Sequence, residues 1–230
     1  TPGWFARDGE VFARVGDVLL GKDKLPLPPR PRWLVDPALI ALAVPEAEGI
    51  FADVVRRTGL ELGEAESVSV TGEIDRLYWA FRWLQGREAW DADGALITQH
   101  HPSLGPGVKE RFAFSKGVTG DEVAKGNRIR TRFRGQLKKL LGTDGVLILP
   151  TMPDIAPLRV TSEADLEDFR NRALRLLCLS GLSGFPQITM PVARREGAPM
   201  GVSLIGPKGS DASLLKLALR YERASRVKIA

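Results

Sequence analysis

Short apolar runs bounded by proline and glycine mark the last third of the chain. Val146–Leu149 is apolar at every position, and Gln187–Val192 and Val202–Ile205 are rich in apolar residues. A strand that is apolar on both sides is typical of a sheet that helices cover on both faces. We therefore predict three strands here, within an α/β fold of three layers, α/β/α, around a mixed central sheet.

Apolar residues elsewhere recur at the spacing of an amphipathic helix. Three of the expected helices begin at capping signals, namely Asp8, Thr119-x-x-Glu122 and Ser162-x-x-Asp165, in which a side chain satisfies a free backbone N–H. The predicted helices run from Asp8 to Gly21, from Pro45 to near Gly59, over Glu73–Trp90, from Thr119 to about Leu141, from Ser162, and from Ser210 or Asp211.

The connecting segments carry different signals. Lys22–Pro31 contains four prolines and predicts a stiff connector, because proline disfavours both helix interiors and central strands. Trp33–Val35 and Ser67–Val70 predict short strands, and Gln99–Gly107 predicts a loop. No repeat divides the chain, so residues 1–230 are expected to belong to a single domain.

Composition fits a globular protein, with 43% hydrophobic and 27% charged residues among 230. No apolar run reaches the ~20 residues of a membrane span, and no charged-then-apolar leader opens the chain. Cys178 is the only cysteine, which excludes an internal disulfide and fits a reducing compartment. We expect a cytoplasmic protein without a membrane partner, in which Cys178 is a buried, inert thiol.

The positive charge is concentrated in one segment. The net charge is +5, and six basic residues lie between Arg128 and Lys139, on a predicted helix. A phosphate-binding face is conceivable there. Phe133 is the only aromatic residue among these charges, and no nucleic-acid motif accompanies them. A solvated helix face that docks on acidic neighbours is therefore favoured over nucleic-acid binding.

No local pattern identifies a reactive centre. Ser180–Gly184 does not fit the G-x-S-x-G elbow, which needs a strand before the serine and a helix after it. It predicts a helix end that turns into a strand. His100 and His101 are adjacent, and no cysteine or third histidine could complete a metal site with them. The residues alone thus indicate an α/β domain, and we expect neither a metal nor a cofactor.

Several longer motifs carry a resemblance to a known family. They are TPGWFARD (Thr1–Asp8), HPSLGPG (His101–Gly107), GVLILPTMP (Gly145–Pro153), FRNRAL (Phe169–Leu174), SGLSGFPQITMPV (Ser180–Val192) and GVSLIGPKGSDASLL (Gly201–Leu215). Together they resemble the amidase signature family of serine hydrolases. The resemblance implies hydrolysis of a carboxamide by a serine that a lysine activates through a second serine on a cis peptide bond.

In that family the Ser/Gly-rich catalytic signature precedes the segment that resembles TPGWFARD. This sequence contains no Gly-Gly-Ser-Ser-Gly-Gly run. The resemblance therefore implies the C-terminal portion of one amidase domain, with the N-terminal catalytic part missing. We expect no catalytic residue in this chain and no activity of the chain alone.

The motifs look most like the plant-type amidase 1 branch, which hydrolyses indole-3-acetamide and related aryl amides. Many relatives, including tRNA-dependent amidotransferase subunits, have asparagine where this chain has Gly181. This departure favours a small-amide hydrolase over an amidotransferase subunit.

The resemblance also implies which residues line the acyl-binding cleft. By their positions in the motifs these are Trp4, Phe5, Thr151, Met152, Leu177, Ser180 and Gly181. Apolar walls with a few polar points would suit an aromatic amide. Ordinary core packing is the competing interpretation for each of them, and for Leu177 it is the favoured one.

Three kinds of partner follow from this interpretation: a small-molecule amide, the missing N-terminal part of the same enzyme, and a second copy of the chain. Self-association is expected because the missing part would otherwise cover a sheet edge or an apolar face. Two alternatives stay open. The chain could be a non-catalytic binding module that uses the basic helix over residues 128–139, or a pseudo-amidase scaffold.

Overall fold

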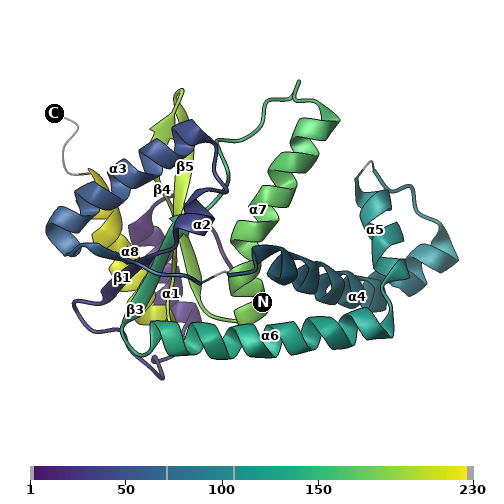
Figure 1. Ribbon diagram of the computed structural model, residues 1–230, viewed down its shortest axis with the longest axis horizontal. Coiled ribbons are helices and arrows are strands. Elements are labelled where there is room, and N and C mark those ends of the chain that lie inside the picture. The colour runs from purple at the N-terminus through teal and green to yellow at the C-terminus, as the bar shows by residue number, and fades with distance from the viewer. Residues whose placement is uncertain (1–2, 71, 106, 227–230) are drawn as a thin grey trace.

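A five-stranded sheet with the order β2-β1-β3-β5-β4 forms the centre of the computed structural model, which describes residues 3–70, 72–105 and 107–226 (Figure 1). β1 pairs with β2 and β3 in parallel, whereas β5 pairs with β3 and β4 antiparallel, so the sheet is mixed as predicted. The strands are β1 Arg32–Val35, β2 Ala65–Ser67, β3 Gly145–Pro150, β4 Gln187–Arg195 and β5 Ala198–Ile205.

Helices cover both faces of this sheet, which confirms the three-layer arrangement. On one face, Leu147 and Ile205 pack with side chains from α4, α6 and α7. On the other face, Val146 and Leu204 pack with α3 and α8. The helices are α1 Gly9–Leu19, α2 Pro37–Ile40, α3 Pro45–Leu62, α4 Ile74–His100, α5 Val108–Gly117, α6 Gly120–Leu141, α7 Glu163–Ser183 and α8 Asp211–Arg226.

The capping signals in the sequence begin the helices that they predict. Asp8 Oδ1 accepts a hydrogen bond from the Val11 backbone N–H at 2.8 Å. Thr119 and Glu122 bond reciprocally, with Glu122 Oε2 accepting from the Thr119 N–H at 2.8 Å. Ser162 Oγ accepts from the Asp165 N–H at 3.1 Å. Each bond satisfies a backbone donor that the first turn of a helix leaves free.

Several predicted boundaries were wrong. α4 continues ten residues beyond Trp90 and ends at His100, so the first part of the predicted loop over Gln99–Gly107 is helical. The second strand lies at Ala65–Ser67 rather than Ser67–Val70. At Val70 the backbone N–H donates to a side chain, Asp36 Oδ2 at 2.7 Å, and not to a neighbouring strand. The helices α2 and α5 were not predicted from the sequence.

The segment around Ser180 is the helix end that the sequence predicts. α7 ends at Ser183, and Gly184 follows in the left-handed conformation with φ of 67°, which glycine adopts without steric cost. β4 begins three residues later. β4 also contains Pro191, beside a register shift between Met190 and Ala193. A proline is tolerated there because β4 is an edge strand of the described sheet.

The helices α4, α5 and α6 extend away from the sheet, and α5 lies at the far end of this projection (Figure 1). None of the helices in the described ranges combines the length and hydropathy that crossing a membrane requires.

Candidate functional site

Three hydroxyl groups and one amide meet where β3 ends. Ser203 Oγ lies 2.8 Å from Thr151 Oγ1 and 2.9 Å from Thr189 Oγ1, and it accepts a hydrogen bond of 3.0 Å from Gln187 Nε2. We call these four residues the hydroxyl cluster. Ser203 alternates along β5 with Ile205, which packs on the α7 side, so the cluster lies on that face of the sheet.

A glycine next to the hydroxyl cluster leaves room for the Thr151 and Thr189 side chains. Gly201 lies next to Ser203 on the same face of β5, and a Cβ atom there would be 2.8 Å from Thr151 Oγ1 and 3.1 Å from Thr189 Cγ2. Ser203 is fully buried, Thr151 and Gln187 are half-buried, and Thr189 is exposed. The hydroxyl cluster therefore forms a polar boundary between the core and a solvent-facing part of the sheet.

The side chains of the hydroxyl cluster form hydrogen bonds, and none of them carries a charge. Its groups can donate to a carbonyl oxygen or accept from an amide N–H. A hydroxyl becomes a nucleophile only beside a base. In the described part of the chain, no lysine, histidine or carboxylate hydrogen-bonds to Thr151, Thr189 or Ser203. The arrangement suits binding of a neutral polar group rather than covalent chemistry.

The predicted site residues from the second half of the chain lie near α7 and the end of β3. Thr151 belongs to the hydroxyl cluster, and Met152 follows it, half-buried, in the connection to α7. Ser180 Oγ donates to the Phe185 carbonyl at 3.0 Å at the end of α7. Gly181 lies against the ring of Phe81 on α4, and Leu177 is half-buried one turn earlier.

Trp4 and Phe5 lie elsewhere. Trp4 stacks on Phe12 of α1 with ring centroids 4.8 Å apart, and its Nε1 donates to the Phe12 carbonyl at 3.3 Å. Phe5 is fully exposed. α1 packs on α8, which covers the sheet face opposite α7. The structure thus does not bring this pair together with the other predicted site residues.

Cys178 is a buried thiol, as predicted. Its side chain is fully buried, and burial raises its pKa to about 12. A thiolate is therefore strongly disfavoured at neutral pH. Among the residues that the structure describes, no group of three or more histidine, cysteine, aspartate and glutamate side chains is placed to hold a metal ion.

Sequence reasoning missed three members of the hydroxyl cluster, namely Gln187, Thr189 and Ser203. A signal was available, because Gln187 and Thr189 alternate with apolar residues in β4, and Ser203 interrupts an apolar run in β5. Alternation places such residues on one face of a strand. Only the antiparallel register, which sets Thr189 opposite Ser203, shows that the polar positions coincide.

Known proteins are similar to this chain in sequence and in fold. A family model described as Amidase matches residues 40–215. Amidase 1 of Arabidopsis thaliana is 31% identical over 94% of this chain and 58% of its own length. The chloroplastic outer envelope protein 64 of the same plant is 31% identical over 93% of this chain and 41% of its own length.

A solved structure titled "Crystal structure of amidase" superposes with a TM-score of 0.79 at 22% identity, over 97% of this chain and 52% of that one. The chain thus spans about half the length of these relatives. The match over residues 40–215 covers most of the chain, and the fold agrees with it. The chain belongs to the amidase family, the amidase signature family that its motifs resemble.

Proposed function

We propose that this chain is the C-terminal portion of an amidase that converts a small carboxamide and water into a carboxylate and ammonia. The observation that carries the proposal is the hydroxyl cluster, which joins Thr151, in a motif of the family resemblance, to Ser203 and Thr189. Neutral donors and acceptors at the edge of an apolar core suit an uncharged amide group. The cluster would orient the substrate, and the reacting groups would come from the other part of the enzyme.

The proposal includes the prediction that the chain alone is inactive. Hydrolysis through a serine needs a nucleophile, a base and donors that stabilise the oxyanion. The hydroxyl cluster supplies hydrogen bonds, and no base contacts it within the described ranges. The N-terminal part of the same enzyme is therefore the proposed partner.

The proposed substrate is indole-3-acetamide or a similar aryl amide. The motifs of the plant-type branch and the likeness to Amidase 1 of Arabidopsis thaliana support this choice. Met152 and Leu177, both half-buried near α7, would offer apolar contacts to an aromatic ring. We keep a cytoplasmic location as part of the proposal, because an unpaired Cys178 fits a reducing compartment.

A chimera tests this function. Residues 3–226 would replace the matching segment of Arabidopsis Amidase 1, and ammonia release from indole-3-acetamide would be measured. We expect turnover by the chimera and none by the isolated chain. Replacing Thr189, the exposed hydroxyl of the cluster, with alanine should raise KM about fivefold, the equivalent of roughly 1 kcal/mol for one neutral hydrogen bond. Thr143→Ala, at an exposed turn before β3, is the matched control and should leave KM unchanged.

A second candidate is a non-catalytic scaffold. The chloroplastic outer envelope protein 64 is as similar to this chain as Amidase 1 is, at 31% identity each. The same chimera separates the two candidates. A chimera that melts cooperatively but hydrolyses neither aryl nor aliphatic amides would favour the scaffold. Turnover whose KM rises in Thr189→Ala would favour the amidase.

A further inference from the structure

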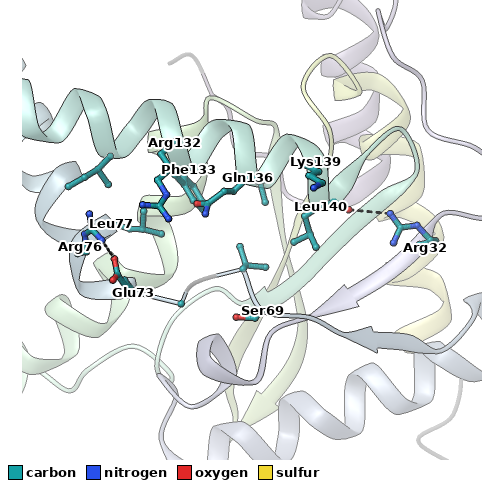
Figure 2. Close-up of a pocket in the computed structure, with 14 residues that line it drawn as sticks. Arg32, Ser69, Glu73, Arg76, Leu77, Arg132, Phe133, Gln136, Lys139 and Leu140 are labelled. Carbon is teal, nitrogen blue, oxygen red and sulfur yellow. Dashed lines mark hydrogen bonds and ion pairs between the residues drawn. The ribbon is translucent and has the colours of Figure 1, made fainter.

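A groove of about 870 Å³ lies between α6 and the segment that leads from β2 into α4 (Figure 2). Its floor is apolar and belongs to the core, with Leu77, Phe133 and Leu137 all buried. Its rim is polar, with Ser69 on one side and Gln136 on the other. We call it the basic groove, because four arginine and lysine residues line it against one glutamate, Glu73.

Two of these four cations form ion pairs with carboxylates in the described part of the chain, and two do not. Arg32 Nε lies 3.2 Å from Asp144 Oδ1, and Arg76 pairs with Glu73. Arg132 and Lys139, both exposed, form no ion pair with any residue in the described part of the chain. Figure 2 shows Arg132 and Arg76 near one end of the groove, and Lys139 and Arg32 near the other. The groove thus offers uncompensated positive charge at both ends.

The spacing of the two unpaired cations is set by the helix. Arg132 and Lys139 are seven residues apart on α6, which places them on the same face about 10 Å from each other. Between them α6 lines the groove with Phe133, Gln136 and Leu137. On a helical peptide, two carboxylates seven residues apart are also about 10 Å from each other on one face, and the side chains three and four positions after the first lie between them.

An aromatic surface continues the groove along the same flank. Trp79 and Trp83 follow Arg76 at helical spacing on α4, and their rings stack with centroids 6.1 Å apart. Lys125 of α6 lies 5.3 Å from the centroid of the Trp83 ring. Trp79 is 44% exposed, a large fraction for a tryptophan. Tryptophan and arginine side chains are enriched among the residues that dominate protein interfaces.

From these features we propose that the basic groove binds an acidic peptide segment of a partner protein, with two carboxylates on either side of apolar side chains. The carboxylates would pair with Arg132 and Lys139, and the apolar residues between them would contact the floor. An acidic peptide fits better than nucleic acid. Nucleic acid offers no aliphatic side chains for the apolar floor, whereas a peptide offers them and can also donate a backbone N–H to Glu73.

A binding experiment on the chain itself tests the proposal. The probe is a fluorescein-labelled peptide that contains Glu-Ala-Ala-Leu-Leu-Ala-Ala-Glu between alanine-rich flanks, and fluorescence anisotropy reports its binding. We expect micromolar affinity that weakens as salt rises. The double variant Arg132→Glu with Lys139→Glu should bind at least tenfold more weakly. Gln136→Trp, which fills the groove without a change of charge, should weaken binding as well.

The matched control carries the same change of charge on another face of α6. Arg134 and Lys138 are exposed and do not line the groove, so Arg134→Glu with Lys138→Glu should alter affinity less than twofold. Equal losses in both double variants would overturn the proposal, because binding would then reflect net charge alone. The proposal would also fail if the wild-type chain did not bind the peptide. It would fail as well if single-stranded DNA bound more tightly than the peptide and its binding depended on Arg132 and Lys139 in the same way.

Discussion

The ring of Phe81 fills the space where a side chain at residue 181 would begin. A Cβ atom on Gly181 would stand 2.5 Å from Cε2 of Phe81, well inside van der Waals contact. The glycine therefore lets α7 approach α4 closely. Asparagine, which the family resemblance associates with this position, would not fit beside Phe81 in the present arrangement of these helices.

Gly181→Ala should destabilise the chain. Alanine gains about 1 kcal/mol of helix propensity over glycine, but the overpacked contact with Phe81 costs roughly 1–3 kcal/mol. We expect a net loss of about 1 kcal/mol in the free energy of unfolding, measured by urea titration. A second substitution, Phe81→Leu, should reduce that loss, because it removes the ring.

Gly135 provides the control for this prediction. It lies on α6, and no heavy atom outside its own helical turn comes within 4 Å of its would-be Cβ atom. Gly135→Ala should therefore stabilise the chain by about 0.5–1 kcal/mol. If both alanine variants were stabilised alike, the packing of Phe81 against Gly181 would not be the constraint that we infer.

Cys178 should resist alkylation in the folded chain. Its pKa of about 12, raised by burial from 9.0, leaves about a thousandfold less thiolate at pH 8 than an exposed cysteine would have. Iodoacetamide labelling, followed by mass spectrometry, should be slow in buffer and should accelerate across the urea transition. Rapid labelling without denaturant would show that the region around α7 opens readily.

Asp8 should make the stability of α1 depend on pH. Its hydrogen bond from the Val11 N–H, aided by Arg7, lowers the pKa of the carboxyl below its ordinary value of 3.8. Because the pKa is lower in the folded state, the stabilisation is complete above 3.8 and is lost as pH falls through the lower folded value.

Asp8→Asn is the test of this dependence, because asparagine still caps a helix but does not titrate. The difference in unfolding free energy between wild type and variant should stay constant above about pH 5 and change as the pH is lowered further. A difference that did not vary with pH would mean that the Asp8 carboxylate contributes nothing through its charge.

The chain should self-associate through β4. Within the described sheet β4 is an edge strand, nine residues long, and an open edge can pair with a strand of another molecule. Sedimentation velocity should show a sedimentation coefficient that rises with protein concentration. Thr189→Lys places a charge on this exposed edge and should reduce the rise, whereas Thr143→Lys, at a turn before β3, should not. A monomer at every concentration would contradict the expectation.

Local chemistry explains which elements could be predicted. The caps at Asp8, Thr119 and Ser162 and the uniformly apolar β3 are short-range signals, because each depends on residues within one turn or one strand. The extension of α4 to His100 was not predictable in this way. Its last ten residues include Gly94, which disfavours a helix, but a Cβ there would lie 2.7 Å from the ring of Trp90, so glycine is required by packing.

The sequence by itself determined the α/β class, most element positions and the family, because these depend on periodicity, capping and contiguous motifs. Tertiary structure alone decided which distant residues meet. The pairing of β5 with β3 and β4 brings Thr151 and Thr189 to Ser203, and the packing of α4 on α6 brings Trp83 beside Lys125. Such contacts depend on strand register and helix packing, which no local pattern encodes.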